Sequence, residues 1–203
     1  MTLVDEIVLK RLGTLPYVQA LQAMREFTGG RSEATPDEIW MLEHPPVYTL
    51  GQGATSALNK ASAIPVIASD RGGEITYHAP GQAILYTLVD LARCRISVKR
   101  FVWLLEQAVI DLVGPRAERR AGAPGVYVGG AKLAALGIRV KRGRAYHGLA
   151  LNVDMDLSPF AAIDPCGYPG LAVTQLRDLG MNENVFQAGN RLAGILVQRL
   201  DHA

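Results

Sequence analysis

The sequence predicts an α+β fold in which helices flank a mixed β-sheet. Short β-rich segments alternate with glycine and proline turns, amphipathic helical patterns lie between them, and residues 125–153 have the pattern of an antiparallel meander. With 203 residues, the chain is long enough for one well-buried core. No internal repeat or low-complexity linker divides it, so we expect a single domain over residues 1–203.

Periodicity and turn residues define the elements of the N-terminal half. Loose alternation predicts a first strand at residues 3–12. The next helix begins after Thr14 and Pro16 and ends at Gly29-Gly30. Its apolar face is expected to contain Val18, Leu21, Met24 and Phe27. Short apolar segments predict further strands at 38–42, 64–68 and 84–89.

The C-terminal half contains the strongest amphipathic pattern. Ser97 is the expected N-cap of a helix that ends at Gly114-Pro115. Its apolar face is expected to be Val98, Phe101, Val102, Leu105, Val109 and Leu112. The meander consists of segments 125–130, 131–140 and 145–153, and two helices are expected after it, at 171–180 and 184–201.

Composition and charge exclude several classes of function. The net charge of +2 and the pI near 8.6 are too mild to indicate nucleic-acid binding. The N-terminus has no apolar signal region and no segment is long enough to cross a bilayer, so we expect a cytoplasmic protein. The basic cluster of Arg139, Lys141, Arg142 and Arg144 is expected to be a solvated hairpin face or, less often, a dock for an acidic partner.

Cysteine and histidine spacing argue against a metal site. Cys94 and Cys166 form no metal-binding pair, and no two histidines have zinc-helix spacing, so no metal or cofactor is expected. The sequence also lacks a Gly-x-Ser-x-Gly elbow and a phosphate-binding Gly-x-x-x-x-Gly-Lys loop.

Four residues are candidates for chemistry. Cys166 lies between prolines and glycines and is either an accessible nucleophile or an incidental small loop residue. Lys132 is the lone charge among small and apolar residues, which favours a lysine aimed into a cleft over one that reaches out to water. His78 and His147 could move protons, although a hydrogen-bonded core histidine is the safer interpretation of each.

The stretch at residues 69–90 joins a glycine turn, Gly72-Gly73 after Arg71, to a buried strand. This stretch contains one of six motifs that occur in order over about residues 40–180. Together the six closely resemble the motifs of the lipoyl(octanoyl) transferases. These motifs are HPPVYTxG from His44, RGGExTYHxPGQ from Arg71, PGV from Pro124, the Lys132 segment to Ile138, HGLALN from His147 and PCG from Pro165.

The resemblance implies a fold like that of the biotin and lipoate protein ligases, and a reaction. By resemblance, Cys166 takes octanoyl from acyl carrier protein as a thioester, and the ε-amine of a lysine on a lipoyl domain then takes it as an amide. By the same resemblance, Lys132 is expected to lower the pKa of the cysteine. The acceptors implied are lipoyl domains of 2-oxoacid dehydrogenase complexes and the glycine cleavage H protein, and we expect a monomer without cofactors.

The same resemblance implies the residues of the acyl pocket and its supports. The expected supports are His147 and Asn152. The expected pocket residues are Arg71, Gly72, Gly73, Glu74, Ile75, Thr76, Tyr77, His78, Ala135, Leu136, Gly137, Gly148, Leu149 and Ala150.

One departure and three alternatives remain. Ala79 stands where the family usually has glycine, and its methyl group could alter the pocket and the preferred acyl length. The nearest alternative is an ATP-dependent lipoate or biotin protein ligase, which needs no nucleophilic cysteine. The others are a non-catalytic protein that binds acyl carrier or lipoyl domains, and a cysteine hydrolase that releases free octanoate.

Overall fold

The computed structural model describes residues 7–54, 62–163 and 170–203, and its centre is a seven-stranded mixed sheet. The strand order is β1 (Val8–Thr14), β2 (Glu38–Glu43), β6 (Gln82–Leu88), β10 (Arg144–Asn152), β9 (Ala131–Lys141), β8 (Gly125–Val128) and β7 (Ala117–Arg119). β1 and β2 are parallel, whereas the other neighbouring strands are antiparallel. The expected mixed sheet and the meander at its centre are confirmed.

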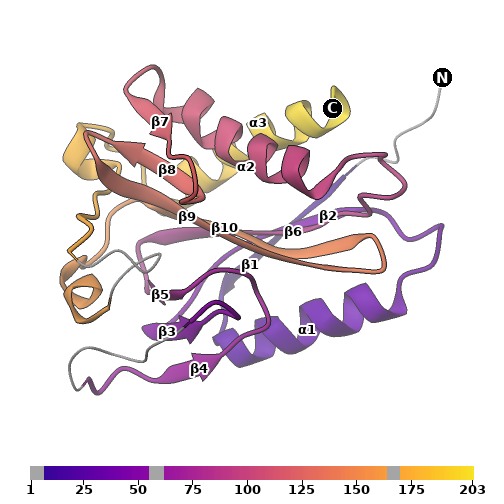
Figure 1. Cartoon of the computed structure of the whole chain (residues 1–203), viewed down its shortest axis with the longest axis horizontal. Coiled ribbons are helices and arrows are strands. Elements are labelled where there is room, and N and C mark those ends of the chain that lie inside the picture. Colours follow the sequence, from indigo (N-terminus) through magenta and orange to yellow (C-terminus); the bar gives the residue numbers. More distant parts are fainter. Residues whose placement is uncertain (1–6, 55–61, 164–169) are drawn as a thin grey trace.

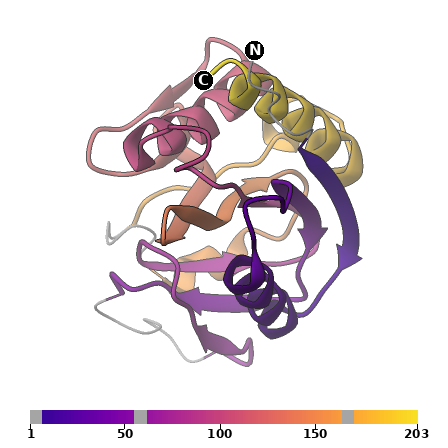
Figure 2. The same cartoon turned by 90° about the vertical axis from the view of Figure 1, so that its right-hand side faces the viewer.

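Helices cover both faces of this sheet (Figures 1 and 2). On one face α2 (Val98–Val113) and α3 (Val185–Asp201) lie against each other, and the largest apolar cluster fills the space between them and the sheet. α1 (Tyr17–Gly30) covers part of the opposite face over a second apolar cluster. Because both faces are covered, every residue of the central strand β6 is buried.

A second, three-stranded sheet lies on the same side as α1 (Figure 1). Its order is β4 (Val66–Ala68), β3 (Val47–Leu50) and β5 (Ile75–His78), and it packs on the 3-10 turn Ser158–Ala162 through a third apolar cluster. The sequence stretch at 69–90 therefore joins the two sheets, since β5 belongs to the small sheet and β6 to the large one.

The helix ends follow local rules that the sequence predicts. The Ser97 hydroxyl accepts a hydrogen bond from the Arg100 amide at 3.1 Å and begins α2. α3 begins with a reciprocal capping box between Asn184 and Gln187. None of the helices in the described parts of the chain is long and apolar enough to cross a membrane.

Several expectations were wrong. The helix predicted at 171–180 is absent, and only Arg177–Leu179 forms a 3-10 turn. Residues 172–174 instead pair with the backbone of Lys132, whose amide donates to the Ala172 carbonyl at 2.8 Å, while the Thr174 amide donates to the Lys132 carbonyl at 2.9 Å. This tertiary pairing overrides the local apolar pattern.

Short strands and helix faces account for the remaining differences. The strands β3, β5 and β7 were missed, because segments of three or four residues with turn residues on either side give no clear period. Val18 and Val98 were expected on apolar helix faces but are 54% and 47% exposed, because the buried face of each helix runs through neighbouring positions, such as Tyr17 and Leu21 in α1 and Phe101 and Leu105 in α2.

The close approach of β10 to β6 depends on a glycine, which gives a test of the sheet. A Cβ at Gly148 would lie 2.1 Å from the Leu85 carbonyl oxygen, so Gly148→Ala should lower the free energy of unfolding by about 1–3 kcal/mol. A Cβ at Gly194 in α3 would meet nothing within 4 Å, so Gly194→Ala should raise the free energy of unfolding by about 0.5–1 kcal/mol. Urea unfolding measures both values; equal effects would contradict this packing.

Candidate active site

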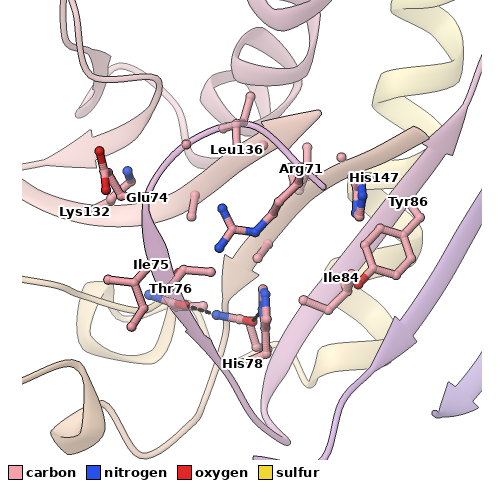
Figure 3. Close-up of a pocket in the computed structure, with 18 of the residues that line it drawn as sticks. Arg71, Glu74, Ile75, Thr76, His78, Ile84, Tyr86, Lys132, Leu136 and His147 are labelled. Atoms are coloured by element: carbon pink, nitrogen blue, oxygen red, sulfur yellow. Dashed lines mark hydrogen bonds between the residues drawn. The ribbon is translucent and has the colours of Figure 1, made fainter. Parts of the chain in front are cut away.

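A cavity of about 760 Å³, its open mouth included, lies between the two sheets. Strands β5, β6, β9 and β10 and the loop before β5 supply most of its wall (Figure 3). Residues from elsewhere complete it, namely Tyr17 of α1, Phe160 and Val173.

Paired small residues make the floor of this pocket. Directly opposite residues of an antiparallel pair share one face of a sheet. Gly137 pairs with Gly148 and Ala135 with Ala150, so the face of the large sheet toward the pocket carries almost no side-chain volume at these four positions. The intervening residue, Leu149, belongs to the core on the helix-covered face. The missing volume leaves room for a slender apolar group.

The two ends of the pocket differ in chemistry. Figure 3 shows Lys132 and Glu74 at one end, and Tyr86 and His147 at the other. Lys132 is only 4% exposed, and its Nζ donates a hydrogen bond to the Pro124 carbonyl at 3.2 Å. Its Nζ also lies 5.5 Å from the centre of the Tyr127 ring. The lysine is therefore aimed into a cleft, as the sequence predicts.

The position of Cys166, the predicted nucleophile, lies outside the described residues. What the structure describes is the chain that follows it: residues 172–174 pair with the backbone of Lys132, and Val173 lines the pocket. That Cys166 lies beside Lys132 stays a prediction. Cys94 is half-buried, and burial together with the nearby Asp37 raises its pKa to about 11, so this thiol is not a reactive thiolate at neutral pH.

A chain of directed hydrogen bonds forms one wall of the pocket. Arg71 donates to the Thr49 hydroxyl, and the Thr49 oxygen lies 3.4 Å from Nε2 of His78. Nδ1 of His78 lies 2.7 Å from the Gln82 side-chain oxygen, so the ring donates there. Gln82 donates to Asn152 at 2.8 Å, and Asn152 donates to the Thr174 carbonyl at 2.9 Å. This chain ties Arg71 to the segment that pairs with Lys132.

A second polar group closes the end away from Lys132. Nδ1 of His44 lies 2.5 Å from the Leu15 carbonyl, which can only accept, so Nε2 of the neutral ring accepts from the Tyr86 hydroxyl at 2.6 Å. Both Tyr146 and His147 donate to Asp70, at 2.8 Å each. Adjacent strand residues normally point to opposite faces, and here the left-handed backbone of His147, with φ of 63°, lets both reach one carboxylate.

Burial keeps the histidines of this pocket uncharged. It lowers the pKa of His44 to about 4 and that of His78 well below the usual value. Burial also lowers the pKa of His147, more than the hydrogen bond to Asp70 raises it. For Asp70, burial acts in the opposite direction, but hydrogen bonds from His147, Tyr146 and Arg25 bring its pKa well below the usual value. Both histidines of the sequence analysis are thus hydrogen-bonded and buried, and both line the pocket.

The predicted pocket residues fall almost entirely on this cavity. Of the fourteen, Gly72 and Tyr77 are not among the lining residues in the described parts of the chain; the supports His147 and Asn152 line it too. Tyr77 packs on the other side of β5, with its ring centre 5.3 Å from Tyr48 and 5.5 Å from Phe160. Six residues that also line the cavity were not assigned from the sequence, namely Tyr17, Gln82, Ile84, Tyr86, Phe160 and Val173.

The structure also locates Ala79 and the basic cluster, which the sequence analysis singled out. Ala79 is buried in the cluster of Tyr77, Met155 and Phe160, behind the pocket wall rather than on its surface. Of the basic cluster, Arg139, Lys141 and Arg142 are exposed on the β9–β10 hairpin, whereas Arg144 pairs with Asp90 at 3.2 Å. Among the residues that the structure describes, no group of three His, Cys, Asp or Glu is placed to hold a metal ion.

The fold and the pocket define a class of protein: an α+β fold with a slot between two sheets that has room for a slender apolar group, and with a buried lysine at one end of the slot. Comparisons with known proteins agree. The family model described as the lipoyl protein ligase A/B catalytic domain matches residues 16–191. The octanoyltransferase of Dechloromonas aromatica is 54% identical over 198 residues, covering 96% of this chain and 97% of the relative.

A second relative and two solved structures extend the comparison. The octanoyltransferase of Thiobacillus denitrificans is 58% identical over 194 residues, 94% of this chain and 89% of the relative. The bi-partite lipoate protein ligase of Thermoplasma acidophilum has a TM-score of 0.78 at 15% identity, over 97% of this chain and 84% of that one. A biotin protein ligase from Aquifex aeolicus has a TM-score of 0.59 at 10% identity, and the match covers 96% of this chain and 70% of that one.

The chain therefore belongs to the lipoyl protein ligase A/B catalytic domain family, and the two relatives named above, both more than 50% identical to it, are octanoyltransferases. The solved structures share the fold at low identity, as the sequence resemblance implied.

The neutral His44 gives a pH dependence of stability. Its pKa is about 4 in the folded protein and about 6.5 in the unfolded chain, so the unfolded chain binds the proton more tightly. Stability should fall as pH decreases from about 6.5 to about 4, with His44 contributing up to about 3 kcal/mol. In urea unfolding at several pH values, His44→Gln should flatten this slope, whereas His202→Gln at an exposed position should not. An unchanged slope in His44→Gln would contradict the buried neutral ring.

Proposed function

We propose that this protein transfers an octanoyl group from octanoyl-acyl carrier protein to the ε-amine of a specific lysine on lipoyl domains, through a thioester on Cys166. The observation that carries this is the buried Lys132 at one end of an apolar-floored slot, with its backbone paired to the segment that follows Cys166. Octanoyltransferases more than half identical over nearly the whole chain support the choice of acyl group.

The reaction takes two steps. In the first, the Cys166 thiolate attacks the thioester carbonyl; the new C–S bond forms as the bond to the carrier thiol breaks, and that sulfur leaves as thiolate and takes a proton. In the second, the acceptor amine attacks the enzyme thioester, loses a proton and forms an amide, and the Cys166 thiolate leaves. Exchange between thioesters is nearly isoenergetic and amide formation is downhill, so no ATP is required.

Lys132 has two roles in this scheme. As an ammonium it stabilises the thiolate of Cys166, because an opposite charge within a few ångströms favours the charged form. As an amine it can take the proton that the acceptor loses. The floor of small residues binds the acyl chain, and each methylene removed from water contributes about 0.8 kcal/mol.

The ATP-dependent ligase is the alternative that the fold itself permits, since lipoate and biotin protein ligases share it. The mass of a purified lipoyl domain, measured after incubation with the enzyme, separates the alternatives. Octanoyl-acyl carrier protein without ATP should add one octanoyl group to the acceptor. Modification only with free octanoate and ATP would establish a ligase. Free octanoate with no modified acceptor would indicate a hydrolase, and association without either product a binding protein.

Replacing the lysine tests the proposed chemistry. Lys132→Met keeps much of the apolar stem but removes the charge and the proton acceptor, so the transfer rate should fall by about 100-fold or more. Lys99→Met, at an exposed position of α2 on the other face of the sheet, is the matched control and should transfer at the original rate. Stopped-time assays of acceptor modification measure both rates. A Lys132→Met enzyme as fast as the control would exclude this role.

Filling the floor tests where the acyl chain lies. Ala135→Leu projects a larger side chain into the slot, so transfer of octanoyl should fall by about tenfold or more while butanoyl transfer is largely retained. Ala131→Leu, on the same strand but outside the slot, should leave the ratio unchanged. The ratio is measured with the two acyl carrier proteins in competition. An equal loss of octanoyl and butanoyl transfer in Ala135→Leu would contradict the proposal that the acyl chain lies on this floor.

A further inference from the structure

One peptide group lies between a buried carboxylate and the lysine. Glu106 of α2 is 7% exposed, and its Oε1 accepts a hydrogen bond from the Gly125 amide at 3.0 Å. The carbonyl of the same peptide unit belongs to Pro124, and it accepts from Nζ of Lys132 at 3.2 Å. A carboxylate on the helix-covered side of the sheet and the lysine at the pocket are therefore joined through a single peptide.

That peptide transmits both position and charge. The peptide unit is a rigid plane, so a hydrogen bond that fixes its N–H also fixes the direction of its C=O. A carboxylate acceptor is a strong one, and hydrogen bonds in series polarise each other. Negative charge on Glu106 therefore increases the electron density on the Pro124 oxygen and strengthens its hold on a protonated Lys132.

Glycine at position 125 is what allows the lysine to come this close. Gly125 has a φ of 144°, and a Cβ there would lie 2.7 Å from Cε of Lys132 and 2.8 Å from the Ala134 carbonyl oxygen. The Pro124–Gly125 peptide thus combines a fixed carbonyl with open space for the lysine stem. The proline-glycine-valine motif of the sequence acquires a physical role here.

We propose that Glu106 is a positioning residue for Lys132, acting through the Pro124–Gly125 peptide to hold the ammonium at the reactive end of the pocket. This rests on the proposed function, since it supposes that the ammonium stabilises the Cys166 thiolate. Other groups that face the lysine are Glu74, which lines the same pocket, and Tyr127 of β8. Both are unchanged in the variants below.

A purely structural role for Glu106 is the competing explanation. Its Oε2 accepts from Nε of Arg119 at 3.0 Å, and Arg119 also stacks on Trp103, with 4.6 Å between the guanidinium carbon and the ring centre. These contacts join α2 to β7 whether or not Lys132 is present. The test therefore needs a measurement that depends on the lysine and not on stability.

That measurement is the rate at which iodoacetamide alkylates Cys166, followed by peptide mass across pH, together with kcat and KM of octanoyl transfer. Glu106→Gln retains an oxygen for the Gly125 amide but removes the charge. We expect a rise of about 0.5 in the pKa of Cys166, and thus about threefold slower alkylation at neutral pH. We expect kcat to fall with KM for octanoyl-acyl carrier protein unchanged.

Two control variants separate an effect on the position of Lys132 from a general loss of protein stability. Glu38→Gln removes an equally buried carboxylate, 5% exposed, that binds Lys10 and Trp40 at the other side of the sheet. Arg119→Met removes the ion pair and leaves the Glu106 bond to Gly125. Both should lower the melting temperature without moving the alkylation profile. If Arg119→Met slows alkylation as much as Glu106→Gln does, or if Glu106→Gln lowers only the melting temperature, the proposal is wrong.

Lys132→Met distinguishes failure of this inference from failure of the function. If Lys132→Met shifts the alkylation profile and Glu106→Gln does not, the Cys166–Lys132 pair stands and the role of Glu106 is refuted. If neither shifts it, the lysine does not act on the cysteine, and the proposed chemistry fails together with this inference.

Discussion

A buried ammonium group is the constraint on which the reactive end of this protein depends. A charged side chain that is 4% exposed is costly unless polar groups meet it. The structure meets this requirement with the Pro124 carbonyl and the ring of Tyr127, both contributed by β8 or the residues before it. The backbone on either side of Lys132 also binds residues 172–174. One residue thus brings together two strands and the segment that follows the predicted nucleophile.

The histidines in and behind the pocket wall meet the opposite requirement, to remain uncharged. An apolar chain enters a slot only if the polar groups in its walls are already satisfied. His78, Gln82 and Asn152 form a directed series of hydrogen bonds, and burial keeps His44 and His78 neutral. The floor has little side-chain volume because glycine and alanine pair across β9 and β10. The pocket thus combines a lysine at one end with a floor of little side-chain volume and walls whose polar groups are hydrogen-bonded to one another.

Much of this fold could be predicted from the sequence, and the exceptions share a cause. The helices with caps at Ser97 and Asn184, and the long antiparallel strands, carry local signals strong enough to locate them. The strand β5 and the pairing of residues 172–174 depend on partners far away in the chain, so no local period reveals them. Of the fourteen pocket residues that the family motifs predict, twelve line the cavity. Tyr17 was missed because it reaches the pocket from an N-terminal helix outside those motifs.

The central claim is that Cys166 carries the acyl group between donor and acceptor. Intact mass of the protein after incubation with octanoyl-acyl carrier protein, without ATP, tests it most directly when Cys166→Ala is treated alongside. The account predicts a gain of one octanoyl group that is absent from the variant and disappears when a lipoyl domain is added. An acceptor that becomes octanoylated at the same rate by Cys166→Ala, with no adduct on either protein, would contradict it.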